Sequence, residues 1–385
     1  MIQGRSFDLR RLATALTISA TMMLTGCGEF FTPVNNNPGP GGTSTFAYVT
    51  NAGGTLTEYS LTNGVMAQLN GSPISLTLAP TELVVAPNNA FLYVGTSTGV
   101  FLYTINSDGT LTEGNDNTVI FLNQAGLSVS SMVVDPTSSW LIMAYTNSTE
   151  IDALQIDPTT GLAVGSAPFT VSSTFNTVSP RLAIAAANNN VAVALGSGGT
   201  QVFGFTPTAT SKTPWGTSVS IPLKTANTSD TAVAIDPTSA YLYVTEADLN
   251  TTPKAGNVRL IKISDLSTDL GDYPTGIGPS AVFADPTGAY VYVTNSADAT
   301  ISAYTFTAAS QSLSPLGTPT PSAKAVFTIA EDSSKTHIFA VGNGGNPNLW
   351  VYSFDATTPG LLNVSSTTST STSSTSLATG LALTH

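Results

Sequence analysis

The chain has 385 residues, of which 41% are hydrophobic and only 9% are charged. This length exceeds that of a typical domain, but it is common for a single all-β or repeat architecture, and the hydrophobic fraction is sufficient for a core. The formal net charge is -12 and Lys and Arg form no cluster, so phosphate backbones are repelled and nucleic acid is not expected as a partner.

The N-terminus has the pattern of a bacterial export signal. A basic start precedes an apolar stretch, residues 12–24, which is too short to span a bilayer. The stretch ends at Leu24-Thr25-Gly26-Cys27, which resembles a lipobox and contains the only cysteine of the sequence. We therefore predict a signal peptide over residues 1–26, lipid attachment at Cys27 and a flexible tether over residues 27–45.

A diacylated or triacylated cysteine holds a protein firmly on a membrane surface. We therefore expect a monomeric protein of the bacterial cell envelope that is anchored through its lipid. Residue Gly28 is not the aspartate that marks inner-membrane retention in enterobacterial lipoproteins. The outer membrane is therefore the preferred location, on its periplasmic or its surface face.

A unit of about 49 residues recurs along the rest of the chain. Its clearest copy, residues 281–306, reads as a short apolar run, a turn at Asp285-Pro286-Thr287-Gly288 and two alternating strands. Pro286 fixes φ in this turn, and the Asp285 carboxylate can accept hydrogen bonds from the backbone that follows. Seven such copies over residues 46–385 match the size of four-stranded propeller blades.

The two ends of the repeat array complement each other. The first copy begins at its second strand, residues 46–51, and residues 376–383 match the missing first strand. We therefore predict an all-β, seven-bladed β-propeller of four-stranded antiparallel blades, closed into a ring by the C-terminal strand. The low-complexity run 364–375 reads either as the outer strand of the last blade or as a Ser/Thr loop.

A Tyr-Val-Thr-Asn sequence recurs in the second strand of the repeat. It occurs at residues 48–51 and 292–295, with near copies at 93–96 and 243–246. Together with the Asp-Pro-Thr turns, these strands resemble the YVTN repeats of the lactonase-like β-propellers, which include 6-phosphogluconolactonases and the fungal muconate-lactonising enzymes. The resemblance covers residues 46–385 and implies the fold. It says little about activity, because the repeated residues build strands and turns.

The resemblance places catalytic groups at the channel mouth, where the first strand of each blade begins. The family has a His before one such strand, a Pro-Arg-His run at the next, and an Asn-Glu after that blade's second strand. Pro180-Arg181 matches the Pro-Arg, but Leu182 replaces the adjoining His, Gly196-Ser197 replace the Asn-Glu, and Ser130 stands where the upstream His is expected. Glu246 fits the Glu position one blade late. Arg181 is interpreted either as a residue that binds an anion or as a structural arginine at a strand end.

Three functions remain open on this basis. The first is a non-catalytic platform that binds a protein or glycan at a mouth lined by Thr81, Ser130, Arg181, Thr231, Ser280 and Lys324. The second is a divergent lactonase for an anionic sugar lactone, with Arg181 as anion clamp and Glu246 or an acidic neighbour as base. The third is an envelope component without a ligand. We favour the first, because no base is found near Arg181 and loss of a general base costs on the order of a hundredfold in rate.

No motif in the sequence supports a cofactor or a metal. His337 falls in a turn and His385 is the last residue, and neither has a partner His or Cys at metal spacing. The acidic segment 108–116, with Glu113 within it, could coordinate calcium, but Asp108-Gly109 is also explained as a hairpin turn. The sequence contains no GxSxG, P-loop or HExxH motif. We therefore expect neither a cofactor nor a metal.

Overall fold

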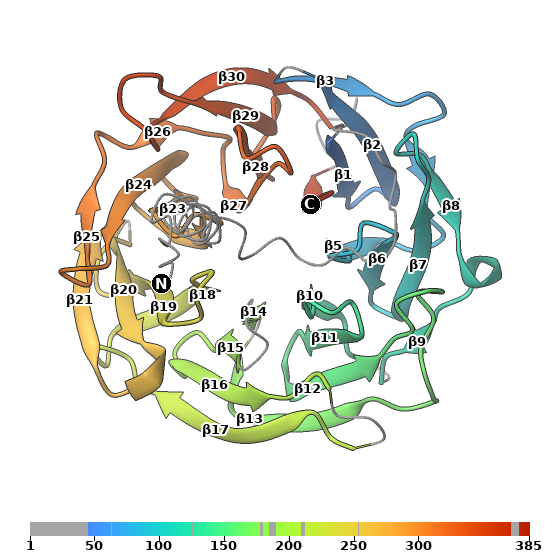
Figure 1. Ribbon diagram of the computed structural model, residues 1–385, viewed down its shortest axis with the longest axis horizontal. Coiled ribbons are helices and arrows are strands. Elements are labelled where there is room, and N and C mark those ends of the chain that lie inside the picture. The colour runs from blue at the N-terminus through green and yellow to red at the C-terminus, as the bar shows by residue number, and fades with distance from the viewer. Residues whose placement is uncertain are drawn as a thin grey trace, which may run out of the picture. The chain divides into compact units, whose positions relative to one another are not determined.

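The computed structural model describes residues 45–62, 64–124, 126–177, 180–184, 190–208, 212–252, 254–370 and 377–385. The predicted signal peptide, Cys27 and all of the tether before Thr45 lie outside the described residues. Within them the strands form seven antiparallel sheets arranged in a ring (Figure 1). The prediction of an all-β, seven-bladed propeller is confirmed. None of the helices in these ranges is both long enough and apolar enough to span a membrane.

Each blade runs from an inner strand to an outer strand in four steps. Blade 1 contains β31 (Ala378–Leu383), β1 (Thr45–Asn51), β2 (Thr55–Thr62) and β3 (Val65–Gln68), with β4 (Ile74–Ser75) also on β2. Blade 2 contains β5 (Pro80–Val85), β6 (Phe91–Thr96), β7 (Gly99–Ile105) and β8 (Leu111–Glu113), with β9 (Phe121–Leu122) also on β7. Blade 3 contains β10 (Val129–Val134), β11 (Trp140–Tyr145), β12 (Ser148–Gln155) and β13 (Phe169–Thr177).

The remaining four blades repeat this order. Blade 4 contains β14 (Arg181–Ile184), β15 (Asn190–Ala194), β16 (Thr200–Phe205) and β17 (Trp215–Ile221). Blade 5 contains β18 (Thr228–Ile235), β19 (Tyr241–Asp248), β20 (Gly256–Lys262) and β21 (Asp269–Pro274). Blade 6 contains β22 (Pro279–Ala284), β23 (Tyr290–Asn295), β24 (Thr300–Thr307) and β25 (Ser312–Pro315), with β26 (Thr320–Pro321) also on β24. Blade 7 contains β27 (Val326–Glu331), β28 (His337–Gly342), β29 (Leu349–Phe354) and β30 (Leu362–Thr368). Two short 3-10 helices, η1 (Asn115–Asn117) and η2 (Ile263–Asp265), also occur in the described ranges.

The C-terminal strand closes the ring, as the sequence predicts. β31 pairs with β1 in an antiparallel register that sets Ala47 opposite Leu383 and Thr50 opposite Gly380. The low-complexity run forms the outer strand β30 as far as Thr368, and residues 371–376 lie outside the described residues. This pairing covers the inner edge of β1, at which strands of other chains could otherwise add.

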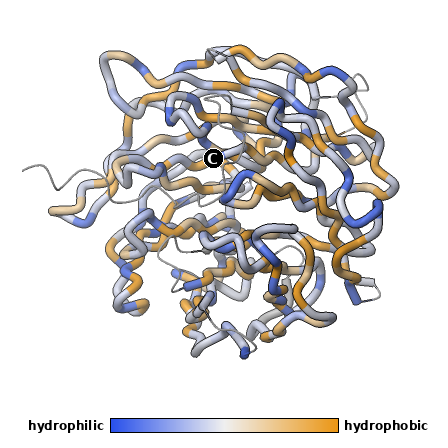
Figure 2. The backbone as a smooth tube through the Cα atoms, turned by 45° about the vertical axis from the view of Figure 1, so that its right-hand side comes forward, coloured by the Kyte–Doolittle hydropathy of each residue, from blue (hydrophilic) through white to orange (hydrophobic). Residues whose placement is uncertain are grey.

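The hydrophobic core is divided among the interfaces between blades. The described residues contain seven buried clusters, and each draws its side chains from two neighbouring blades. The largest fully buried side chain, Trp140, packs in the cluster between blades 3 and 4. Figure 2 shows hydrophobic stretches recurring along the strands throughout the ring. Because the clusters lie between the sheets, the inner strands are free to present polar side chains toward the ring axis.

The tyrosine of the Tyr-Val-Thr-Asn repeat joins one blade to the next. Tyr48 Oη donates to Gly109 O at 2.9 Å, and Tyr292 Oη repeats the contact with Gly360 O at 2.8 Å. Gly109 has φ of +83°, and a Cβ there would come within 2.1 Å of the Phe46 ring. The turn therefore requires glycine for its conformation and for the close approach of an aromatic ring.

The aspartates of the Asp-Pro-Thr turns stabilise the turn in the way the sequence predicts. Asp285 Oδ1 accepts hydrogen bonds from Ala289 N at 2.9 Å and Tyr290 N at 3.0 Å, and the side chain is 4% exposed. Asp135 and Asp236 make the same contacts in blades 3 and 5. The turn in blade 4, where the sequence has no Asp-Pro, falls at residues outside the described ranges.

Candidate functional site

Four of the residues predicted to line the channel mouth share one position, a one-residue bulge in an inner strand. They are Thr81, Ser130, Thr231 and Ser280. Each hydroxyl donates to a carbonyl oxygen of the second strand in its own blade, at distances of 3.1, 3.2, 3.3 and 3.3 Å. Lys324 precedes β27 and is exposed. A binding role for these five residues stays a prediction. The hydroxyl groups of the four bulge residues stabilise the scaffold.

Arg181, the sixth predicted residue, begins β14 and makes two contacts inside the ring. Its Nη1 lies 3.5 Å from Oε2 of Glu82 and donates to the backbone oxygen of Ser130 at 3.3 Å. The side chains of Arg181 and Glu82 are 34% and 18% exposed. The expectation that no base lies near Arg181 is therefore wrong. A carboxylate reaches it from blade 2, across the inner strand of blade 3.

The environment of Glu82 is that of a carboxyl group that can exchange a proton near neutral pH. Burial raises the pKa of Glu82 to about 7, although the Arg181 charge and a hydrogen bond from Leu83 N at 3.0 Å both lower it. Gly380 of β31 adjoins the carboxylate, since a Cβ at Gly380 would lie 3.4 Å from Glu82 Oε1. Glu82 thus accepts a hydrogen bond from the Leu83 backbone on Oε1 and faces Arg181 with Oε2.

Strand register explains why these two residues meet. Glu82 and Arg181 lie opposite Gly95 and Ala194, which both occupy the Thr position of the Tyr-Val-Thr-Asn repeat. In every blade one inner-strand residue pairs with this Thr position, and it is polar in blades 2 to 4 and mostly small elsewhere. From blade 2 to blade 7 and then blade 1, these residues are Glu82, Ser131, Arg181, Ala232, Ala281, Thr328 and Gly380. Sequence reasoning missed Glu82, although a charged residue inside an apolar inner strand, aligned with Arg181 across the repeats, was the available signal.

Glu246, the base predicted from the sequence, lies in a different set of contacts. Its Oε1 is 3.2 Å from Nη1 of Arg259, and the two side chains are 2% and 6% exposed. Arg259 also contacts Asp269 at 3.2 Å, and Lys224 joins the outer end of this network. The structure therefore pairs Arg181 with Glu82 and Glu246 with Arg259. A catalytic role for Glu246 stays a prediction that its burial and its ion pair do not favour.

The other polar candidates are accounted for by turns and by the chain terminus. His337 begins β28, and its Nδ1 contacts Thr336 Oγ1 at 2.9 Å in the same turn. His385 N donates to Asn89 Oδ1 at 2.7 Å. Asp108 Oδ1 accepts from Thr110 N at 3.0 Å, as the hairpin interpretation requires. Within the described ranges no group of three or more His, Cys, Asp and Glu side chains is placed to hold a metal ion.

Known structures share this architecture. No protein-family model and no curated protein sequence matches the chain. A candidate 6-phosphogluconolactonase from Bacteroides fragilis superposes with a TM-score of 0.66 at 12% identity, over 91% of this chain and 100% of its own. The periplasmic gluconolactonase PpgL of Pseudomonas aeruginosa superposes with a TM-score of 0.69 at 13% identity, over 89% and 99%. The chain has the fold of these lactonase-like propellers. At such low identity the likeness concerns the fold alone.

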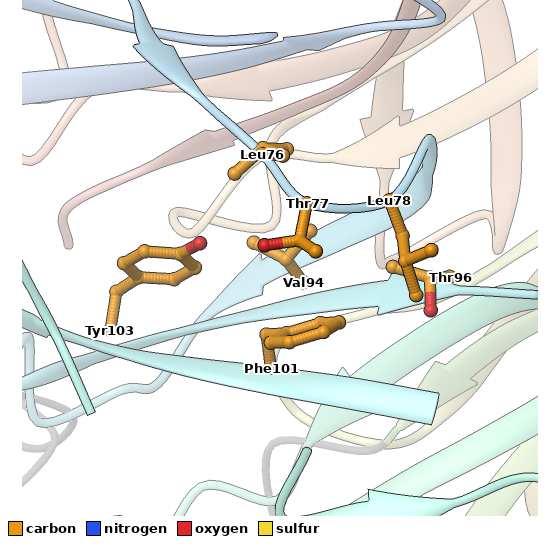
Figure 3. Close-up of a pocket in the computed structure, with 7 residues that line it drawn as sticks. All are labelled: Leu76, Thr77, Leu78, Val94, Thr96, Phe101 and Tyr103. Atoms are coloured by element: carbon orange, nitrogen blue, oxygen red, sulfur yellow. The ribbon is translucent and has the colours of Figure 1, made fainter. Parts of the chain in front are cut away.

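A small pocket lies between the strands β6 and β7 of blade 2 and the segment that joins β4 to β5 (Figure 3). It is lined by Leu76, Thr77, Leu78, Val94, Thr96, Phe101 and Tyr103. The pocket has room for about one water molecule. It contains neither Glu82 nor Arg181, so it is not part of the candidate site.

The site formed by Glu82, Arg181 and the Ser130 carbonyl of the propeller combines two chemical capacities. A guanidinium group can bind a carboxylate, a phosphate or a developing oxyanion through paired N–H donors. A carboxyl group with a pKa of about 7 can accept a proton from water and return it at neutral pH. Together these groups suit the attack of water on an activated carbonyl group.

Proposed function

We propose that the propeller hydrolyses a lactone of an anionic sugar acid, with Arg181 as the anion clamp and Glu82 as the general base. The observation that carries this proposal is the contact between Arg181 Nη1 and Glu82 Oε2 at 3.5 Å. Two of the similar folds belong to proteins named for gluconolactone chemistry, which supports the choice of substrate class. The sequence alone favoured a non-catalytic platform because no base was found near Arg181, and Glu82 supplies a carboxylate at that position.

The proposed reaction uses only the side chains at this site and a water molecule. The Glu82 carboxylate takes a proton from water, and the water oxygen attacks the lactone carbonyl carbon. The tetrahedral intermediate collapses with cleavage of the bond between the carbonyl carbon and the ring oxygen. That ring oxygen takes the proton back from Glu82 and becomes a hydroxyl group, while the new carboxylic acid ionises. Arg181 binds the anionic group of the substrate or stabilises the charge on the carbonyl oxygen.

The proposal is tested by acid release from 6-phosphogluconolactone and glucono-1,5-lactone in a pH-stat. Glu82→Gln should lower kcat on the order of a hundredfold or more, because it removes the base. Glu113→Gln is the matched control, since Glu113 is an exposed residue of the same blade. Arg181→Ala should weaken turnover of the phosphorylated lactone more than that of the neutral one. Wild-type rates no faster than those in buffer alone would reject the lactonase proposal and favour the non-catalytic binding platform. Crosslinking to envelope proteins and glycans would test that platform.

We also propose that Cys27 is diacylated and anchors the propeller to a bacterial membrane, the outer membrane in preference. The support is the sequence of the export signal and its lipobox-like end. Metabolic labelling with a fatty-acid analogue should mark the wild type and not Cys27→Ser. Equal labelling of both proteins would contradict lipid attachment at this residue.

A further inference from the structure

The inner strand of blade 3 holds the backbone on both sides of Arg181. The Ser130 hydroxyl lies 3.3 Å from Pro180 O as well as 3.2 Å from Ala144 O, and its single proton is shared between these acceptors. The Ser131 hydroxyl accepts a hydrogen bond from Leu182 N at 3.2 Å. The residues immediately before and after Arg181 are thus both tied to one serine pair.

One member of this pair, Ser130, also contacts the guanidinium group directly. Arg181 Nη1 donates to Ser130 O at 3.3 Å while it faces Glu82. Ser131 is 6% exposed and Leu182 is 8% exposed, so their hydrogen bond is shielded from competing water. Hydrogen bonds that are buried in this way are costly to leave unmade, which makes them effective constraints on position.

Arg181 needs such constraints because it is the first residue of its strand. Within the described residues β14 pairs with β15 from Arg181 to Ile184. A first residue has pairing on one side only, and strand ends fray more readily than strand centres. Blade 3 therefore supplies the constraint that the ladder of blade 4 does not provide on the N-terminal side of Arg181.

We infer that Ser130 and Ser131 are positioning residues that fix Arg181 against Glu82, and that they set the affinity of the site for an anionic ligand. This inference rests on the proposed role of Arg181 as anion clamp. Ser131 acts through the Leu182 backbone, and Ser130 acts through the Pro180 backbone and through its own carbonyl oxygen. Neither hydroxyl touches the reacting atoms.

The test measures the Arg181–Glu82 contact without relying on turnover. The pKa of Glu82 is followed by carbon NMR of its side-chain carboxyl group in the full chain, with assignment from Glu82→Gln. Arg181→Ala should raise the pKa of Glu82, because the lowering effect of the arginine is lost. Ser131→Ala should raise it toward the Arg181→Ala value, and Ser131→Thr, which keeps the acceptor oxygen, should restore the wild-type value.

Ser366→Ala is the matched control. The Ser366 hydroxyl also joins two blades, because it donates to Gly64 O at 3.1 Å, but it lies on the outer strand of blade 7. This variant should leave the pKa of Glu82 at its wild-type value. Ser130→Ala provides a second reading if Ser131→Ala fails to fold. A wild-type pKa of Glu82 in the folded serine variants would overturn the positioning role.

The kinetic arm separates this inference from the proposed function. If the wild type hydrolyses 6-phosphogluconolactone, Ser131→Ala should raise KM for it, as expected when ground-state binding is lost. If the wild type hydrolyses nothing, the lactonase proposal fails. A raised pKa of Glu82 in Ser131→Ala would still support the positioning of Arg181, and an unchanged pKa would still reject it.

Discussion

Glu82 and Arg181 form an ion pair although 99 positions separate them in sequence and their blades are not neighbours in the ring. The charged groups approach to 3.5 Å across the inner strand of blade 3. Both side chains retain some exposure, so water and small ligands can compete for each partner. The pair therefore couples the ionisation of Glu82, the candidate base, to the positive charge of Arg181, the candidate anion-binding residue.

This coupling predicts the pH dependence of hydrolysis. Glu82 must be ionised to act as a base, and its pKa is raised to about 7 by burial. We expect kcat/KM to rise with pH and to reach half of its maximum near that value. Arg181→Ala should shift the midpoint upward, and Arg181→Lys, which keeps the charge, should shift it less. pH–rate profiles at constant ionic strength, corrected for spontaneous hydrolysis, provide the measurement, and a flat profile would exclude Glu82 as the base.

A pair of buried carboxyl groups lies within blade 5. Asp230 and Glu246 are opposite each other in the ladder of β18 and β19, and both side chains are 2% exposed. Thr200 Oγ1 donates to Asp230 Oδ2 at 2.6 Å, while Oδ1 has no hydrogen-bond partner within the described ranges. Burial raises the pKa of Asp230, and the charge of Glu246 raises it further. The folded protein therefore favours a proton on this pair.

We predict that this proton makes stability depend on pH. The folded state holds a proton that the unfolded state releases at lower pH, so its contribution to stability is complete in acid and is lost as pH rises toward neutrality. The free energy of unfolding of Asp230→Asn, relative to that of the wild type, should rise by about 1–3 kcal/mol when the pH is raised from about 5 to about 8. Urea unfolding at both pH values measures this difference, with Asp116→Asn as an exposed control. A stability difference between Asp230→Asn and the wild type that does not change with pH would contradict a proton held by Asp230 and Glu246.

Arg259 should be a major contributor to the stability of blade 5. Arg259→Met would leave the Glu246 carboxylate buried without its cation, and we expect a loss of about 3–5 kcal/mol in the free energy of unfolding. Lys224→Met removes a cation from the exposed end of the same network, where the side chain is 44% exposed, and should cost about 1 kcal/mol or less. Denaturant titrations of the two variants compare these losses. Adding Glu246→Gln to Arg259→Met should recover part of the stability.

The sequence was sufficient to predict the propeller because each repeated residue has a local or next-blade task. Asp285 bonds to its own turn, and Tyr48 and Tyr292 bond to the glycine of the following blade. Thr294 Oγ1 lies 2.9 Å from the Ser280 hydroxyl, so the Thr of the repeat also supports the scaffold. Periodicity and turn chemistry encode all of these contacts, and the complementary chain ends encode the closure of the ring.

The site was predicted only in part because its contacts cross the ring. Arg181 was identified from its position, but its partner depends on which inner-strand residues share one level, and a bulge shifts that level by one residue. Six inner strands, β5, β10, β18, β22, β27 and β31, have a register shift near the mouth, whereas the pairing of β14 with β15 runs without one from Arg181 to Ile184. The aligned mouth residues Thr81 and Ser130 are therefore bulge residues, and Glu82 is the one that matches Arg181.

Ring closure makes the last strand a sensitive test of the fold. Leu381 is 7% exposed and packs in the cluster between blades 7 and 1, whereas Leu377, four positions earlier, is 41% exposed and precedes the strand. Leu381→Ala should lower the free energy of unfolding by about 2–5 kcal/mol, because it leaves a cavity at the seam. Leu377→Ala should change it by about 0.5 kcal/mol or less.

Urea unfolding midpoints of these two leucine variants compare the buried and exposed positions at equal chain length. A chain ending at residue 375 extends the comparison, because it loses the pairing of β31 with β1 and exposes the edge of β1. We expect that chain to unfold at lower temperature and to self-associate, as measured by thermal scans and size-exclusion chromatography. Equal midpoints for Leu381→Ala and Leu377→Ala, with an unaltered truncated chain, would mean that the seam contributes nothing to stability.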